Sequence, residues 1–188
     1  MRKAALLLAV SILGAPAMGT LPRPVGMQIA EGAQQQIGVT VVYDPAYVSL
    51  RYPGGDLPLN RGVCADVVVR AFRVAGIDLQ RAVHEDMVHA FKRYPAFWGL
   101  SRPDTNIDHR RVPNLMKFFE RSGKIASGTF LPGDVVAWRL PGGLYHIGVV
   151  SAEVAPSKRP LVIHNIGQGA QKEDVLFAYQ IIGHYRWQ

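Results

Sequence analysis

Apolar residues recur at helical spacing in the first part of the chain. The clearest stripe covers residues 64–75, where the apolar positions are spaced three and four residues apart and Gly76 follows as a stop signal. The same spacing predicts further helices over residues 26–39, 79–92 and 113–123, and a proline opens the last of these. The pattern therefore predicts that this part of the fold is mainly helical.

The second part of the chain changes to short β-rich runs separated by turns. After a Leu-Pro-Gly-Asp turn, the predicted strands are residues 135–138, 145–151, 161–164 and 179–187. A shorter run at 40–43 precedes a proline- and glycine-containing loop at 47–60. Helices followed by consecutive strands predict an α+β domain, with N-terminal helices packed on one side of an antiparallel sheet.

The N-terminus has the order of parts that an export signal requires. Two basic residues precede the apolar stretch 4–13, and small residues suited to cleavage end at Ala17. We expect a signal peptide over residues 1–17, a single domain over 18–188, and a periplasmic or extracellular location. The apolar stretch is shorter than the roughly 20 residues of a membrane span, so we expect no stable membrane insertion after cleavage. Retention of the signal as an anchor is the alternative.

Composition narrows the classes of partner. The chain has 188 residues, 48% of them hydrophobic and 19% charged, which favours one folded domain with a sizeable core over disorder. Its formal net charge is +7, and the leader supplies two of these charges. A basic exported protein suits acidic polymers such as the cell wall, whereas nucleic acid is not an expected partner outside the cytoplasm. The oligomeric state does not follow from composition.

Cys64 is the only cysteine in the chain, and it stands directly before the apolar run of the predicted 64–75 helix. Exported proteins usually join their cysteines in disulfide pairs, and this chain offers Cys64 no partner. Cys64 is therefore either a small buried apolar residue of the core or a reactive thiol. A helix N-terminus and a nearby imidazole both stabilise a thiolate, so the position predicts a nucleophile that needs a histidine base.

Two histidines stand where such a base and its partner are needed. His146 opens a predicted strand after a glycine-rich turn, and His164 ends another. If these strands are neighbours, His164 can orient the ring of His146, with Asn165 as its competitor. Surface or capping roles are the alternative for each histidine. Cys64, His146 and His164 are also valid zinc ligands, but we favour the hydrolytic interpretation and expect neither metal nor cofactor.

These residues resemble the NlpC-type papain-like cell-wall cysteine peptidases. The resemblance rests, in chain order, on Gly62-Val63-Cys64-Ala65-Asp66-Val67-Val68, Leu131-Pro132-Gly133-Asp134-Val135-Val136, His146-Ile147-Gly148-Val149-Val150 and Val162-Ile163-His164. An exported bacterial branch known mainly as a domain of unknown function is also similar, through residues 43–45, 104–111 and 183–187.

The resemblance implies a papain-like fold and a cysteine peptidase or amidase that hydrolyses an amide bond in peptidoglycan stem peptides. Cys64 would be the nucleophile, His146 the base and His164 the orienting residue. A non-catalytic wall-binding module of the same fold and an acyl-transfer or lipid-amide enzyme are the alternatives. The helical insertion after the Cys64 helix departs from the family pattern, as does Val63-Cys64-Ala65-Asp66 in place of Asp-Cys-Ser-Gly.

The resemblance also implies a tyrosine upstream of the cysteine, near the oxyanion. Tyr52 is the matching candidate, and Tyr43 and Tyr47 are its competitors. The backbone N–H of Cys64 would be the second oxyanion donor.

A polar segment at residues 104–111 supplies candidates for substrate binding. Asp108, Arg110 and Arg111 are named for this role because guanidinium groups pair bidentately with carboxylates. The alternative is a structured loop held by internal hydrogen bonds. A calcium loop is disfavoured because His109 stands where such loops require glycine.

Overall fold

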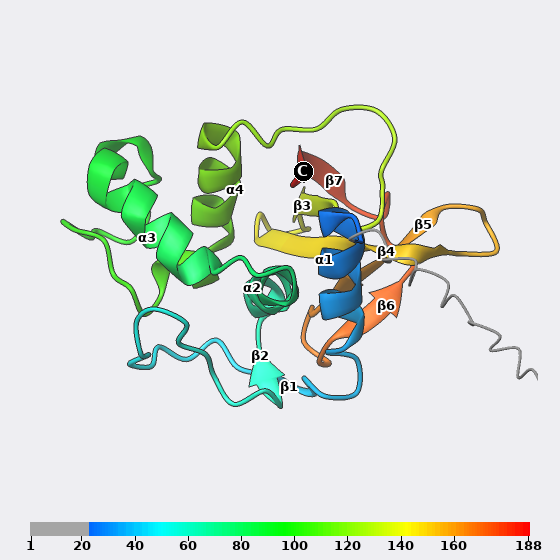
Figure 1. The fold of residues 1–188 in the computed structure, drawn as a ribbon, viewed down its shortest axis with the longest axis horizontal. Helices are drawn as coiled ribbons and strands as arrows, with labels where there is room; N and C mark the ends of the chain where they lie inside the picture. The colour runs from blue at the N-terminus through cyan, green and yellow to red at the C-terminus, as the bar shows by residue number, and fades with distance from the viewer. Residues whose placement is uncertain (1–22) are drawn as a thin grey trace, which may run out of the picture.

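The computed structural model describes residues 23–188, so the expected signal peptide over residues 1–17 lies outside the described residues (Figure 1). The helices are α1 (Val25–Gln34), α2 (Cys64–Val74), α3 (Leu79–Ala90) and α4 (Val112–Arg121), with 3₁₀ turns η1 (Phe91–Arg93) and η2 (Asp108–Arg110). The strands are β1 (Val42–Tyr43), β2 (Arg61–Gly62), β3 (Val135–Arg139), β4 (Tyr145–Val154), β5 (Pro160–His164), β6 (Gln171–Glu173) and β7 (Gln180–Tyr185). This order confirms the predicted α+β class.

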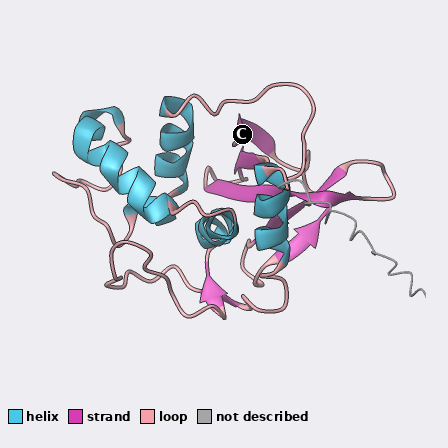
Figure 2. Cartoon of the chain, viewed as in Figure 1, coloured by secondary structure: helices cyan, strands magenta, loops and turns pink. Residues whose placement is uncertain are grey.

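The five strands β3 to β7 form one antiparallel sheet in the order β6-β5-β4-β3-β7 (Figure 2). Strands β1 and β2 form a separate parallel pair. In Figure 1 the sheet lies on one side of the molecule and α3 and α4 on the other, with α2 between them. Among residues 23–188, no helix has the length and apolar character of a membrane span.

The sheet separates two clusters of buried side chains. On one face α1 and α2 pack against β4, whose Ile147 and Val149 have no exposed surface. The other face carries a smaller cluster made of Val136, Trp138, Val150, Val162 and Leu176. The alternation of side chains along each strand directs neighbouring residues into different clusters.

The structure differs from the predicted elements where tertiary contacts override local pattern. Helix α1 ends at Gln34 rather than at residue 39, because Gln36 turns inward and donates to the carbonyl of Val67 at 2.8 Å. Strand β6 was not predicted, since its Gln-Lys-Glu sequence has no apolar alternation. It pairs with β5 at the edge of the sheet, where one polar face is tolerated.

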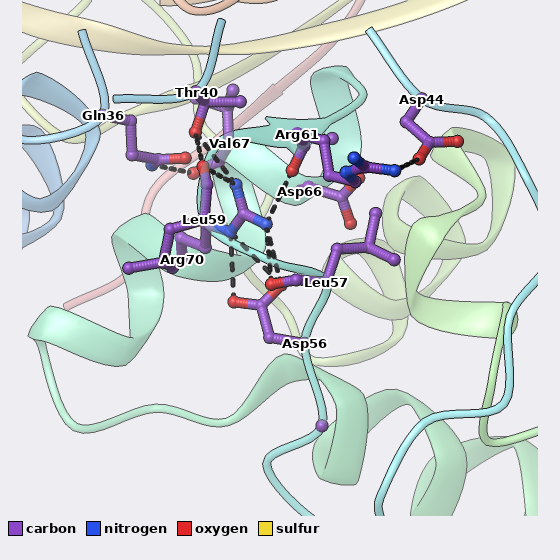
Figure 3. A network of polar contacts seen from close by, with 12 residues as sticks. Gln36, Thr40, Asp44, Asp56, Leu57, Leu59, Arg61, Asp66, Val67 and Arg70 are labelled. Carbon is purple, nitrogen blue, oxygen red and sulfur yellow. Dashed lines mark hydrogen bonds and ion pairs between the residues drawn. The ribbon is translucent and has the colours of Figure 1, made fainter. Parts of the chain in front are cut away.

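The loop at residues 47–60 is tied to α2 by a buried arginine (Figure 3). The guanidinium of Arg70 donates to both carboxylate oxygens of Asp56, at 3.0 to 3.2 Å. It also donates to Thr40 Oγ1 at 2.9 Å and to the carbonyl of Arg61 at 2.9 Å. These bonds fix the chain that leads into Cys64 without regular secondary structure in the loop.

A second buried ion pair holds the start of α2. Asp66 Oδ2 accepts the backbone N–H of Val63 at 2.7 Å, and the two carboxylate oxygens accept from Arg110 at 2.9 and 3.1 Å. Arg110 also donates to the carbonyls of Ala46 and Asp44, at 2.9 and 3.0 Å. Arg110 is therefore occupied by internal partners, which corrects its prediction as a substrate-binding residue.

We predict that Arg110→Met lowers the free energy of unfolding by about 3 to 5 kcal/mol, because it leaves the buried Asp66 carboxylate without a counter-ion. Urea denaturation at neutral pH measures the change. The matched control is Arg81→Met, whose pair with Glu85 is exposed and should cost at most about 1 kcal/mol. Equal losses in the two variants would contradict a structural role for the Asp66–Arg110 pair.

Candidate active site

Cys64 is the first residue of α2 and is buried beside a pocket of about 200 Å³. The pocket brings together residues from β1, the start of α2, the 107–112 segment and β4. Its lining residues are Tyr43, Pro45, Val63, Cys64, Ile107, Arg110, Val112 and Tyr145. The thiol thus lies at the N-terminus of a helix, next to a space that a small group can enter.

The environment of the thiol opposes its ionisation. Burial raises the pKa of Cys64 to about 12, although the backbone N–H groups of Ile147, Ala65 and Cys64 itself act to lower it. The nearby carboxylate of Asp66 raises the thiol pKa as well. At neutral pH the Cys64 side chain is therefore a neutral thiol.

The sheet register places the two histidines side by side. His164 on β5 pairs with Gly148, two residues along β4 from His146, so the two side chains are diagonal neighbours on one face. His146 Nε2 lies 2.8 Å from His164 Nδ1, and the His146 ring stacks on Trp138. A Cβ atom at Gly148 would lie 3.0 Å from that of His164 and closer still to Val162, so the glycine leaves the room that the pair occupies.

Both imidazoles are held neutral. Burial, together with the smaller effect of His164, lowers the pKa of His146 to about 3. Burial also lowers the pKa of His164. In a neutral pair, one ring donates the single shared proton and the other accepts it, so the tautomer of one histidine determines that of the other.

Glu173 on β6 is the residue that the sequence analysis missed at this site. Its Oε2 lies 2.9 Å from Nε2 of His164, and its charge raises the pKa of that histidine. The Nε2–H bond is not aligned with the oxygen, so the contact is electrostatic rather than a hydrogen bond. The carboxylate favours a proton on His164 Nε2, which leaves Nδ1 to accept from His146. That arrangement leaves the lone pair of His146 on Nδ1.

The thiol and the imidazole pair lie at the same end of the sheet but on its two different faces. Ile147 packs with Cys64 and α2, whereas the neighbouring His146 stacks on Trp138 on the other face. Cys64 meets β4 at the backbone N–H of Ile147, the residue directly after His146. Asn165, the competitor of His164, instead donates to the carbonyl of Gly62 at 2.9 Å and so ties the end of β5 to the start of α2. Within residues 23–188, no hydrogen bond joins the Cys64 thiol to the His146 ring.

The structure does not bring Tyr52 to Cys64, so the matching tyrosine is corrected to Tyr43. The ring of Tyr52 packs edge-on against His84 of α3, with centroids 5.0 Å apart, because the loop at 47–60 runs toward that helix. Tyr43 lines the Cys64 pocket, and the pairing of β1 with β2 places it beside Gly62. The hydroxyl of Tyr47 instead donates to Asp104 at 3.0 Å.

The 104–111 segment is a structured loop whose carboxylates are occupied. Asp108 accepts the backbone N–H of Asp104 at 2.5 Å and a bond from Arg111 at 3.4 Å, so it is not free to bind substrate as predicted. Asp104 accepts from the backbone and side-chain amides of Asn106. Across residues 23–188, no group of three or more His, Cys, Asp or Glu side chains is placed to hold a metal ion.

Comparison with known proteins identifies relatives along most of the chain. A family described as "Domain of unknown function (DUF1287)" matches residues 30–187. A protein of Escherichia coli (strain K12), "Uncharacterized protein YijF", is 58% identical over 166 residues, which are 86% of this chain and 81% of that protein. The solved "Structure of NlpC1 from Trichomonas vaginalis" is similar with a TM-score of 0.46 and 13% identity. This match covers 86% of the present chain and 44% of that one.

The buried neutral histidines predict a loss of stability in mild acid. The pKa of His109 is lowered from 6.5 to about 4, mainly by burial and also by Arg110, and that of His146 to about 3. Between pH 6.5 and these values the unfolded chain binds protons that the folded chain does not, so the free energy of unfolding falls as the pH falls. Each histidine contributes up to about 1.4 kcal/mol per pH unit.

Urea denaturation at several pH values between about 7 and 4.5 measures this slope. We expect His109→Gln to reduce the slope, whereas His89→Gln, at an exposed position of α3, leaves it unchanged. A slope that is the same in wild type and His109→Gln would contradict the prediction.

Proposed function

The chain belongs to the DUF1287 family, and from that premise we propose that it is an exported cysteine hydrolase of papain-like fold that cleaves an amide bond in peptidoglycan peptides. The observation that carries the proposal is the buried imidazole pair, 2.8 Å apart, at the end of the sheet where β4 meets the Cys64 thiol. The chain order of the cysteine helix, the Pro-Gly-Asp turn and the two histidine strands supports the same superfamily.

In this proposal Cys64 attacks the carbonyl carbon of the scissile amide. Because the thiol and the imidazole are both neutral, the thiol proton passes to Nδ1 of His146 as the sulfur–carbon bond forms, rather than in an earlier ionisation. In the free protein the His146 ring faces Trp138 on the other side of the sheet from Cys64, so this step requires the ring to turn toward the thiol when substrate binds. Protonated His146 then donates to the leaving amine, and water hydrolyses the thioester with His146 again as the base.

In the proposed mechanism, two groups stabilise the negative oxygen of the tetrahedral intermediate. The backbone N–H of Cys64 belongs to the first turn of α2, whose N–H groups lack partners within the helix. The second is the hydroxyl of Tyr43, a residue that lines the same pocket. A preorganised donor of this kind contributes roughly 3 kcal/mol to transition-state stabilisation.

Glu173 is assigned a positioning role in this mechanism. Its carboxylate beside His164 favours the tautomer that keeps the lone pair of His146 on Nδ1, and it stabilises the positive charge that the pair carries after proton transfer. The substrate class rests on the export signal, the basic net charge and the family resemblance, since a positively charged protein suits an acidic wall polymer.

A second candidate function is a non-catalytic module that binds wall peptides in the same pocket. Two observations favour it: the raised pKa of Cys64, and a His146 ring that stacks on Trp138 and makes no hydrogen bond to the thiol in the described part of the chain. Such a module would bind purified wall material without releasing any product.

We predict that the mature protein releases products from purified muropeptides and that Cys64→Ala and His146→Ala abolish the release. Mass spectrometry of the reaction measures it, and thermal unfolding shows whether the variants remain folded. Equal turnover by wild type and Cys64→Ala would exclude the thiol mechanism. Binding of wall material with no turnover by wild type would favour the non-catalytic module.

We predict that Glu173→Gln lowers kcat by about tenfold or more with little change in KM. Proton transfer by a positioned side chain typically accelerates a reaction about a hundredfold or more, and loss of the orienting carboxylate removes part of that acceleration. Loss of the carboxylate lowers the pKa of His164, so the acid limb of the rate profile should move to lower pH. The control is Glu153→Gln, which removes an exposed carboxylate that pairs with Lys172 instead. A profile and kcat unchanged in Glu173→Gln would remove this residue from the mechanism.

A further inference from the structure

A second pocket of about 300 Å³ lies within the helical insertion, between α3, η1, the loop that follows it, and α4. Its walls are mainly apolar, and its volume is in the range of pockets that hold small ligands. The lining residues are Met87, Phe91, Lys92, Tyr94, Pro95, Ala96, Trp98, Leu100, Asp108, Arg111 and Asn114. None of these residues lines the pocket beside Cys64.

Arg111 gives this pocket a cation that internal contacts leave largely available. Its neighbour Arg110 places its guanidinium on Asp66 and two backbone carbonyls. Within residues 23–188, Arg111 makes a single side-chain hydrogen bond, to Asp108 at the long distance of 3.4 Å. The side chain of Arg111 is nevertheless only 16% exposed. A shielded guanidinium with most of its five donors unused fits an anionic ligand group.

Trp98 fixes the orientation of that guanidinium. The central carbon of the group lies 4.1 Å from the centroid of the Trp98 ring, within the range of a cation–π contact. Asp108 is the one carboxylate paired with this guanidinium among the described residues, through Oδ1 at 3.4 Å, while its other oxygen accepts the backbone N–H of Asp104. A planar guanidinium held against an aromatic face presents its edge, which is the geometry that a carboxylate binds bidentately.

A row of aromatic rings leads from this pocket to the pocket beside Cys64. Trp98 contacts Phe97 with centroids 5.6 Å apart, and Phe97 stacks on Tyr145 at 6.2 Å. Tyr145 in turn lines the Cys64 pocket. The two ring-to-ring distances are 5.6 and 6.2 Å. An extended peptide of about four residues, at roughly 3.3 Å per residue, is long enough to cover both.

We propose that the insertion pocket binds the C-terminal residue of a peptide, with its free carboxylate on Arg111 and an apolar side chain against Met87 and Phe91. The preceding residues lie over Phe97 and Tyr145, so the amide that reaches Cys64 is a few residues from the C-terminus. The position of the cleaved bond rests on the proposed function, whereas carboxylate binding by Arg111 does not.

Calorimetric titration of the mature Cys64→Ala protein tests carboxylate binding without turnover. The probes are acetylated tetra-alanine with a free C-terminal carboxylate, the same peptide as its C-terminal amide, and free alanine, in both the L and the D series. We expect the acid in at least one series to bind about tenfold or more tightly than its amide, as a charge-assisted bidentate pair provides. We expect free alanine to bind more weakly than the peptide acid.

Substitutions assign the preference to Arg111. Arg111→Gln should remove the difference between acid and amide, and Arg111→Lys, which keeps the charge but loses the planar fork, should remove most of it. The matched control is Arg102→Gln, an exposed arginine of the neighbouring loop, which should keep the preference. Thermal unfolding shows which variants are folded. If Arg111→Gln does not fold, the acid-to-amide preference of Arg111→Lys tests the proposal in its place.

Equal binding of acid and amide in both series, or a preference that persists in both Arg111 variants, would overturn the proposal. Free alanine binding as tightly as the peptide acid would replace the peptide anchor with a free amino-acid site and so overturn it too. Turnover of muropeptides by wild type with no acid preference removes this inference alone. An acid preference with no turnover removes the proposed hydrolase alone.

Discussion

The carboxylate of Asp66 connects parts of the chain that are far apart in sequence, and the position of Cys64 depends on it. One oxygen accepts the N–H of Val63 at the start of α2, and both accept from Arg110, which itself holds the carbonyls of Ala46 and Asp44. A buried ion pair recovers its desolvation cost only when both partners are fully hydrogen-bonded, as they are here. This carboxylate therefore fixes the position of α2 relative to the chain around Tyr43 and to the insertion.

Burial at this junction also determines the charge state of the candidate site. Moving a thiolate and an imidazolium out of water is unfavourable, so Cys64 and His146 both rest in their neutral forms, with pKa values of about 12 and about 3. The closest countercharge on the imidazole side is Glu173, beside His164. Under the proposed mechanism, the ion pair formed by proton transfer needs either this carboxylate or the substrate to compensate the lost hydration.

Local pattern predicted the elements of the fold more completely than the site. The apolar stripe that begins at Cys64 appears as α2 within one residue, and the β-branched runs around His146 and His164 appear as neighbouring strands, because both periods are set by burial of one face. Glu173 gave no such signal, since its strand is polar and short and its meaning comes only from the β5–β6 pairing. Tyr52 was placed wrongly because the direction of an irregular loop is determined by distant partners such as His84.

Arg110 and Arg111 show why charge alone could not assign the roles within the polar segment. Both are arginines in the same turn before α4, yet successive side chains at the end of η2 leave the backbone in different directions. One reaches Asp66 and completes the ion pair that fixes α2, and the other turns into the insertion pocket against Trp98. A single short segment therefore supplies both the counter-ion of Asp66 at the start of α2 and the guanidinium in the insertion pocket.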